Sequence, residues 1–328
     1  MLGGAIALSC VATGIHSLSD VAAAFVLFLA VVKRKRIWTA INNNTERIAN
    51  SWQEWHIRSF RIINHSIYAG LAGLVGVLIL YQFGTPVHSI LIISTFSLVG
   101  GALWGQFVEG SPRLLRPFGF YGALFGGIAG LLACRIVFGD PQLITAAAIA
   151  LAAPWVQSIG RFRCLVQGCC HGSLTNGSGI CYTNVHSRVY HIAGLNGKKI
   201  HNTQLYSICC NIITGLVLFR LWYGGCSPVL LVGLYFIFNG STRFVEEAYR
   251  GEPQTKIIAG LRMYQWLAIA SILAGILIST WQSEDVLVFH PAINAEAAVS
   301  AFIVATTWAF SMGMDFPKSN IRFSRLSG

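Results

Sequence analysis

Charged residues are scarce in this chain, and their scarcity decides the class of protein. They make up 11% of the 328 residues, whereas apolar residues make up 54%. Ordinary soluble domains have roughly a quarter of their residues charged. A soluble domain of this size would lack the charged exterior that water requires, so the composition indicates a surface that faces lipid.

Two further absences narrow the class. The apolar segment at residues 1–14 contains no basic residue, which argues against a cleaved signal peptide. The net charge is +11, but no basic stretch is interleaved with the aromatic residues of a nucleic-acid groove. Basic runs such as residues 33–36 are typical of helix ends that face anionic headgroups, so we expect a membrane partner and no nucleic acid.

Apolar stretches of membrane-spanning length repeat along the chain. A bilayer core about 30 Å thick needs roughly 20 apolar residues per helix. We predict an all-α, polytopic membrane protein with a seven-helix core at residues 62–82, 89–109, 118–138, 142–158, 204–224, 227–245 and 261–280. A further stretch, 11–32, is interrupted by His16 and Asp20, and another, 296–313, is short enough to lie in the interface instead.

These spans divide the chain into three parts. Residues 1–61 form an N-terminal hydrophobic segment and a polar arm, residues 62–281 the core, and residues 282–328 an extra helix or interfacial segment with a basic tail. Glycines spaced four apart let membrane helices pack closely, and we assign them no chemistry. They are Gly101 and Gly105 in one span, and Gly122, Gly126 and Gly130 in the next.

Residues 160–203 differ from the rest of the core. They contain arginines, lysines, histidines and cysteines, but no aspartate or glutamate. A segment of that length without a carboxylate has a positive field, suited to an anionic headgroup. We predict that residues 165–203 form a head outside the bilayer, mostly of loop and short elements, with Gly168 and Gly172 in a tight turn.

Two basic clusters suggest phosphate binding. Arg161 and Arg163 follow the fourth core span, and an arginine near the membrane usually faces a cavity, where its guanidinium can grip two phosphate oxygens. Arg243, Glu247 and Arg250 share one helix face by their spacing. A snorkelling arginine and a salt-bridge ladder without a ligand are the plain alternatives for the two clusters.

Three segments in order resemble the prolipoprotein diacylglyceryl transferase family. Residues 160–172 are similar to its signature, which starts Gly-Arg and ends in a glycine-bounded turn. Residues 201–206 resemble His-Pro-Ser/Thr-Gln-Leu-Tyr, although polar residues there also suit a helix cap. Residues 243–250 resemble Arg-Phe-x-x-Glu-x-x-Arg and, more loosely, residues 120–124 resemble (His/Tyr)-Gly-Gly-Leu.

The resemblance implies an enzyme of the bacterial cytoplasmic membrane with an extracytoplasmic head. It implies transfer of diacylglycerol from phosphatidylglycerol to the thiol of a prolipoprotein lipobox cysteine, without a cofactor. By position, Arg161 and Arg243 would hold the phosphate and stabilise the leaving group, and Glu247 and Arg250 would support Arg243. The remaining phospholipid contacts would come from Arg163, Gln204 and Tyr206.

The base that takes the proton of the acceptor thiol stays open. Tyr121 falls where many family members have a histidine proposed as a base. A thiolate is the competent nucleophile, and His171 or His201 could take its proton. These three residues, with Arg161 and Arg243, are the candidate catalytic residues.

The signature also departs from the family pattern. Cys164 stands where the family has asparagine and Cys169 where it has glutamate, and Asn202 and Ser207 replace proline and glutamate. Thiols replace the lost hydrogen-bonding groups poorly. The alternative is therefore a non-catalytic relative that serves as a membrane subunit or lipid-binding scaffold, with a protein partner.

Cysteines gather in this region without a standard pattern. Soft ligands for zinc could come from Cys164, Cys169, Cys170, His171 and Cys181. A disulfide within the head is the other alternative. The spacing of these residues matches no paired zinc motif, so we predict unpaired thiols and no metal.

The topology of the N-terminal extension stays open. If the head lies outside, one N-terminal span would place the basic residues 33–36 outside as well. That conflicts with the positive-inside tendency, so the extension need not cross the bilayer.

Overall fold

The computed structural model describes residues 33–110, 118–252, 256–291 and 293–315, and the predicted span 11–32 lies outside them. The chain forms two compact units, Met1–Thr45 and Glu46–Gly328. Helix α3 (Arg34–Ala49) runs across their boundary, so of the first unit the structure describes only the start of this helix. Residues 34–49 of the predicted polar arm are therefore helical.

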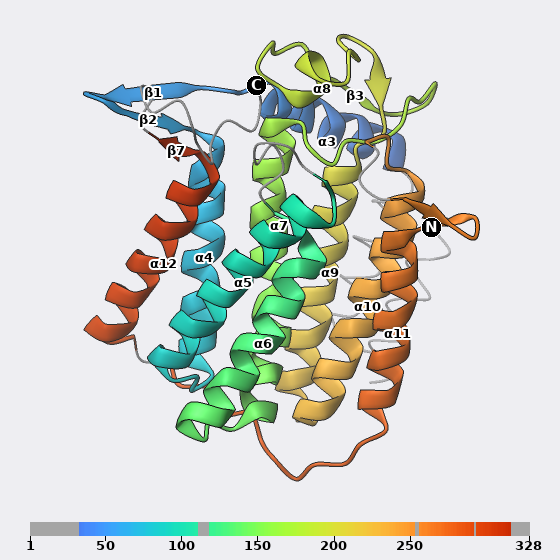
Figure 1. Ribbon diagram of the computed structural model, residues 1–328. Helices are drawn as coiled ribbons and strands as arrows, with labels where there is room; N and C mark the ends of the chain where they lie inside the picture. Colours follow the sequence, from blue (N-terminus) through green and yellow to red (C-terminus); the bar gives the residue numbers. More distant parts are fainter. Residues whose placement is uncertain (1–32, 111–117, 253–255, 292, 316–328) are drawn as a thin grey trace, which may run out of the picture. The chain divides into compact units, whose positions relative to one another are not determined.

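Long helices follow one another through the second unit (Figure 1). They are α4 (His65–Gln82), α5 (Val87–Phe107), α6 (Phe120–Phe138), α7 (Gln142–Gln167), α9 (Thr203–Tyr223), α10 (Pro228–Ala248), α11 (Met263–Ser279) and α12 (Ala295–Gly313). Seven of them are long and apolar enough to cross a bilayer, and α11 is a shorter apolar helix of 17 residues. The predicted all-α polytopic membrane fold is confirmed, with a helix at each predicted core position.

Close helix packing accounts for the glycine stripe of α6. A Cβ atom on Gly126 would lie 2.2 Å from the carbonyl oxygen of Phe96, and one on Gly122 would lie 2.4 Å from that of Gly100. Only glycine permits these approaches between α5 and α6. Helix α12 packs against α4 in the same manner, since a Cβ on Gly70 would lie 3.0 Å from the carbonyl oxygen of Ala305. Helix α12 is therefore part of the bundle.

Helix α7 is longer than predicted and ends at the head. It continues to Gln167, and Gly168 ends it in the left-handed conformation with φ 76°. The span predicted at 142–158 was too short because the charges of Arg161 and Arg163 resemble the end of a membrane helix, whereas both side chains are buried. These arginines therefore lie on the last turns of α7.

The head has the short elements predicted for it. It contains β3 (Ile180–Cys181), α8 (Arg188–His191) and β4 (Lys199–Ile200), and the two strands pair antiparallel. Gly168 adopts positive φ, which suits the tight turn predicted there. Gly172 serves another purpose, because a Cβ there would lie 2.3 Å from the carbonyl oxygen of His201. The head is thus closed over the start of α9.

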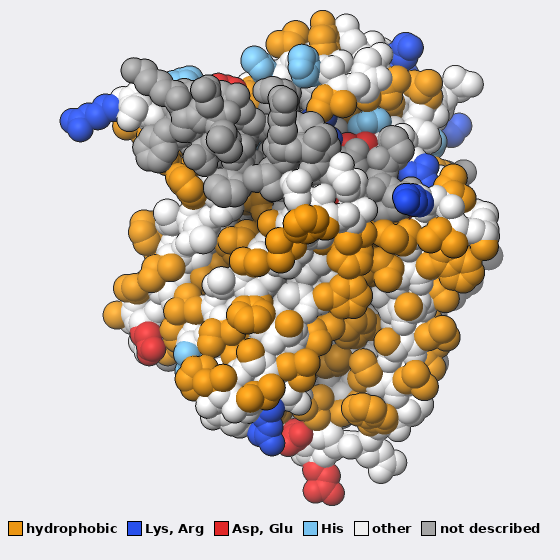
Figure 2. Space-filling view, in the orientation of Figure 1, with side chains coloured by type: hydrophobic (Ala, Val, Ile, Leu, Met, Phe, Trp, Pro, Cys, Tyr) orange, Lys and Arg blue, Asp and Glu red, His pale blue; other side chains and the backbone are white. Residues whose placement is uncertain are grey.

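Small sheets complete the same end of the bundle. Strands β1 (Glu54–Ile57), β2 (Phe60–Ile63) and β7 (Met314–Asp315) form an antiparallel sheet in the order β1-β2-β7. Strands β5 (Ile257–Ile258) and β6 (Leu261–Arg262) form a hairpin before α11. Figure 2 shows apolar side chains over the sides of the helices and charged ones towards their ends, the pattern of a multi-pass membrane protein.

Candidate functional site

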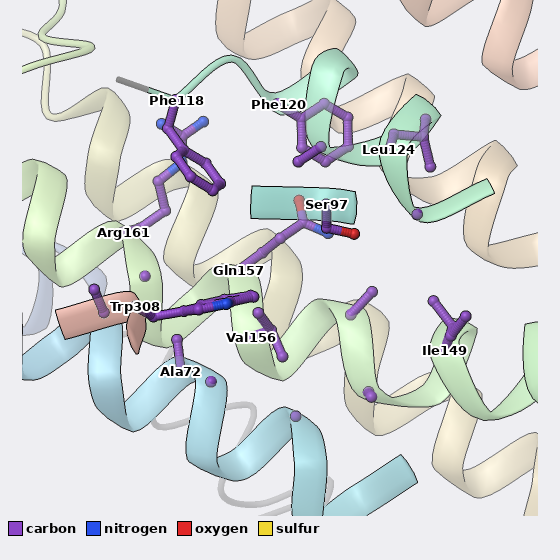
Figure 3. A pocket seen from close by; sticks show the side chains of 18 of the residues that line it. Ala72, Ser97, Phe118, Phe120, Leu124, Ile149, Val156, Gln157, Arg161 and Trp308 are labelled. Carbon is purple, nitrogen blue, oxygen red and sulfur yellow. The ribbon is translucent and has the colours of Figure 1, made fainter. Parts of the chain in front are cut away.

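A cavity of about 380 Å³ lies among α4, α5, α6, α7, α10 and α12. Most of its wall is apolar, with Ala72, Leu124, Ile149 and Trp308 among the lining residues in Figure 3. Polar groups concentrate where α7 approaches the head. An apolar wall with a few convergent polar groups is the usual form of a small-molecule site.

The first polar group is a buried network centred on Glu246 of α10. Its Oε1 accepts hydrogen bonds from Nη2 of Arg161 at 2.7 Å and from Nη2 of Arg250 at 2.6 Å. Nε of Arg161 also donates to the hydroxyl of Ser207 at 3.0 Å. Arg161 is thereby fixed between α9 and α10, and two positive charges share one carboxylate.

Glu247 belongs to the same end of α10 but faces other partners. Its carboxylate lies 3.1 Å from Nε of Arg250 and 3.6 Å from Nη1 of Arg262. Arg243, which it was expected to support, donates instead to Oε1 of Gln157 at 3.1 Å. The guanidinium of Arg243 also lies over the ring of Phe120, 3.9 Å from its centroid, so packing and an amide position this arginine.

Arg163 differs from the other arginines of the cavity. It is 6% exposed, and its Nε and Nη2 have no hydrogen-bond partner among the described residues. Gln167, one turn later on α7, is 1% exposed and its Nε2 is also unpartnered in that part of the chain. Both residues line the cavity. A buried cation without a partner is costly, so this pair of donors marks a place for an anion.

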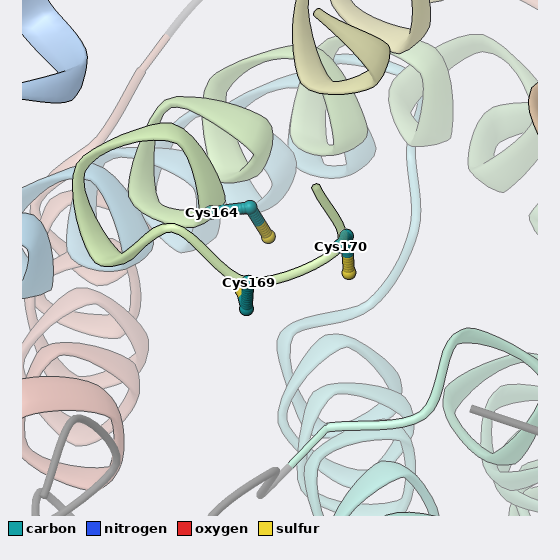
Figure 4. A group of neighbouring side chains, drawn as sticks. All are labelled: Cys164, Cys169 and Cys170. Atoms are coloured by element: carbon teal, nitrogen blue, oxygen red, sulfur yellow. The ribbon is translucent and has the colours of Figure 1, made fainter. Parts of the chain in front are cut away.

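Three thiols of the same cavity lie close together, as Figure 4 shows. The sulfur atoms of Cys164, Cys169 and Cys170 all lie within 4.8 Å of one another, and all three residues line the cavity. The thiols of Cys164 and Cys169 hold the pKa of the Cys170 thiol well below its usual range, and nearby arginines add to this effect. Contacts with Cys164 and Cys170 raise the pKa of Cys169.

The turn that carries two of these thiols is fixed from three directions. The carbonyl of Cys169 accepts from Gln204 at 2.9 Å, and that of Cys170 accepts from the hydroxyl of Thr203 at 2.7 Å. The amide of Cys170 donates to Glu252 at 2.6 Å, and Glu252 also accepts from Arg188 at 3.0 Å. The head thus receives a carboxylate from outside its own sequence, which offsets part of its positive field.

The structure separates the predicted site residues into two sets. The arginines at positions 161, 163, 243 and 250 line the cavity, whereas the other candidates are absent from its described lining. Tyr121 is buried and donates to the carbonyl of Tyr264 at 3.4 Å, and Nδ1 of His171 lies 3.0 Å from the carbonyl oxygen of Gly172. The residues outside the lining are Tyr121, His171, His201, Gln204, Tyr206 and Glu247.

Sequence reasoning missed several residues of this site. Glu246 and Gln157 position the arginines, and Glu252 fixes the turn of the cysteines. A signal for Glu246 and Gln157 was available, because polar groups within membrane spans are usually functional or paired. Glu252 lies past the end of its span, and only the fold brings it to Cys170.

The fold places the chain in the class of multi-pass membrane proteins, here with a cavity between the helices. The profile of the family described as prolipoprotein diacylglyceryl transferase matches residues 21–281. The match covers most of the chain, which therefore belongs to this family and is diacylglyceryl transferase-like. The resemblance drawn from the ordered motifs is confirmed.

Two curated relatives carry the same activity in their names. The phosphatidylglycerol--prolipoprotein diacylglyceryl transferase 2 of Clostridium perfringens (strain 13 / Type A) is 25% identical over 243 residues, which are 68% of this chain and 91% of the relative. The phosphatidylglycerol--prolipoprotein diacylglyceryl transferase of Clostridium tetani (strain Massachusetts / E88) is 28% identical over 201 residues, 55% of this chain and 76% of the relative. Similarity at this level supports the family and its transferase character.

Proposed function

We propose that this chain transfers diacylglyceryl from phosphatidylglycerol to the thiol of a prolipoprotein cysteine, in a bacterial cytoplasmic membrane with its head outside. The observation that carries this proposal is the cavity, which combines an apolar wall with two nitrogen atoms of Arg163 that have no partner among the described residues. Acyl chains suit the wall, and a phosphodiester suits the arginine. The family and the names of its relatives supply the reaction.

Within the cavity, Arg163 and Arg243 are the proposed phosphate ligands. Arg161 already uses Nε and Nη2 on Ser207 and Glu246, so it has less to offer a headgroup than the sequence suggested. Arg163 has two donors without a partner in the described part of the chain, and a guanidinium binds a phosphate through two parallel hydrogen bonds. Charge that develops on the departing glycerol phosphate is then stabilised by groups already in place.

The role of Arg161 becomes one of positioning. It joins α7 to Glu246 of α10, and Glu246 in turn holds Arg250. This network fixes the distance between the helices that carry Arg163 and Arg243. Tyr121, His171 and His201 stay predictions as proton acceptors, since none of them belongs to the described lining of the cavity.

A direct test measures transfer by the purified protein in phosphatidylglycerol nanodiscs supplied with a lipobox peptide. The expected product is the peptide with one diacylglyceryl group on its cysteine, identified by mass. Arg243→Lys keeps the charge but loses the planar donor pair, and we expect its initial rate to fall about tenfold or more, a change of about 1.4 kcal/mol. Exposed Lys198 provides the control, and Lys198→Ala should stay within about twofold of wild type.

One observation favours a second function. Two of the altered signature positions, Cys164 and Cys169, line the cavity itself, so the chain could bind phosphatidylglycerol as a scaffold for a protein partner without transferring it. Native mass spectrometry of the same variants separates the two functions. Retention of phosphatidylglycerol by wild type, weakened in Arg243→Lys, together with no modified peptide would support the scaffold.

A further inference from the structure

The trio of Cys164, Cys169 and Cys170 is not needed for phosphate binding, yet it faces the same cavity. Their three sulfur atoms converge within 4.8 Å although they come from the last turn of α7 and from the turn that follows it. In the part of the chain that the structure describes, no fourth ligand atom joins this group. His171, the next residue, lies outside the cavity lining, and Cys181 is in strand β3.

The turn is shaped to bring these thiols together. Cys170 adopts φ 57°, a left-handed conformation that is unfavourable for a non-glycine residue and persists only where its surroundings hold it. Glu252, Thr203 and Gln204 supply that support through the backbone of Cys169 and Cys170. A strained residue held by three side chains points to a use for its thiol.

The spacing suits a metal with soft ligands. Thiolates bind zinc at about 2.3 Å, and tetrahedral geometry then places sulfur atoms about 3.8 Å apart. The observed upper limit of 4.8 Å would need only a small contraction. Structural zinc sites are closed by four protein ligands, whereas sites with three protein ligands keep the fourth position for water or substrate.

We propose that Cys164, Cys169 and Cys170 bind a zinc ion whose open fourth position faces the cavity and takes the acceptor thiol. The three-thiol site stands on geometry alone, while the identity of its fourth ligand rests on the function proposed above. Zinc fits better than copper(I), because zinc keeps four-coordinate geometry without redox chemistry. The site would supply the thiolate for which the sequence offered only histidines that do not belong to the described lining of the cavity.

The reaction balances in atoms and charge. The acceptor thiol releases its proton to solvent as it binds the metal, because a coordinated thiol is deprotonated. Its sulfur forms a bond to the glycerol carbon of phosphatidylglycerol, and the carbon–oxygen bond to the phosphate breaks. The electron pair leaves with glycerol phosphate beside Arg163 and Arg243, and the neutral thioether product dissociates from the metal.

Charges around the trio suit this arrangement. Arg161 and Arg250 are paired with Glu246 and Glu247, whereas Arg163 has no such partner among the described residues. Three thiolates and one zinc ion carry one negative charge, which the acceptor thiolate raises to two. The guanidinium groups on the cavity wall offset that charge.

Metal analysis tests the site without reference to activity. The full chain, purified under reducing conditions without chelator, should contain about one zinc ion per chain. Cys164→Ser, Cys169→Ser and Cys170→Ser should each lower the zinc content about tenfold or more, while Cys226→Ser leaves it unchanged. Cys226 is the matched control because it lies in the turn between α9 and α10, outside the thiol group. Copper in place of zinc, a disulfide within the trio, or zinc retained by all three variants would overturn the proposal.

Cobalt exchange tests the open position in the wild-type chain, so it does not depend on variants that fold poorly. Cobalt bound by thiolates absorbs visible light, and a lipobox peptide should shift these bands, while the same peptide with serine for cysteine should not. Absence of that shift would overturn the open position. If the peptide coordinates but is never modified, the zinc site stands and the transferase proposal fails. If a chelator removes the metal and transfer continues at the same rate, the zinc inference fails and the transferase proposal stands.

Discussion

Replacement of Arg163 by methionine should change stability and lipid binding in opposite directions. The arginine is 6% exposed, and its Nε and Nη2 have no partner among the described residues. Each buried donor left unsatisfied costs about 1–3 kcal/mol. Methionine is shorter than arginine but adapts to irregular spaces, and Arg163 already borders a cavity, so Arg163→Met removes that cost without opening a void in packed core.

The magnitude follows from the number of donors and from the position of the side chain. Two unpartnered donors at the lower end of that range give about 2 kcal/mol, and the lower end applies because Arg163 borders a cavity rather than packed core. Without phosphatidylglycerol, the variant should therefore be more stable than wild type by about 2 kcal/mol. With phosphatidylglycerol, it should lose two charge-assisted hydrogen bonds, or about 3 kcal/mol and a hundredfold in affinity.

Thermal unfolding in detergent, recorded with increasing phosphatidylglycerol, measures both effects on one sample. The unfolding temperature of Arg163→Met should start above that of wild type and rise less as lipid is added. Arg220→Met is a suitable control, since Arg220 is exposed near the end of α9 away from the head, and its lipid response should match wild type. A lower starting temperature together with an unchanged lipid response would refute the reasoning.

Two further substitutions test the packing and the buried network. Glu246→Gln deprives Arg161 and Arg250 of their shared carboxylate, and thermal unfolding should show a loss of about 3–5 kcal/mol of stability. Glu284→Gln in an exposed loop is the control and should have little effect; equal stability of the two variants would exclude a structural role for the network. Gly126→Ala places a methyl group 2.2 Å from the Phe96 carbonyl oxygen and should cost about 1–3 kcal/mol in thermal unfolding. Gly160→Ala should not destabilise α7, because beyond its own helix backbone a methyl group there meets no atom of the described residues within 4 Å; the reverse order would contradict the close packing of α5 on α6.

The sequence by itself determined the membrane fold and the family. A helix must satisfy its own backbone inside lipid and needs about 20 apolar residues to cross it, so the spans could be counted from composition along the chain. The order of the three motifs then identified the family, because each motif keeps its local spacing whatever its neighbours in space. These features depend on residues close together in sequence.

Tertiary structure decided where α7 ends and how the charges pair. Local spacing placed Arg243, Glu247 and Arg250 on one face of α10, but the carboxylate that joins α10 to α7 is that of Glu246. Its partner Arg161 lies 85 residues earlier in the sequence, and no local pattern connects them. Burial of this pair is also what lets a charged stretch continue as helix to Gln167.

The convergence of the thiols likewise came only from the fold. Cys164 and Cys169 are separated by a helix end, and their spacing matches no metal motif, so the sequence favoured unpaired thiols. The left-handed residues Gly168 and Cys170 reverse the chain, and Thr203, Gln204 and Glu252 hold the turn from other segments. A sequence specifies which side chains exist, but these long-range hydrogen bonds decide which sulfur atoms meet.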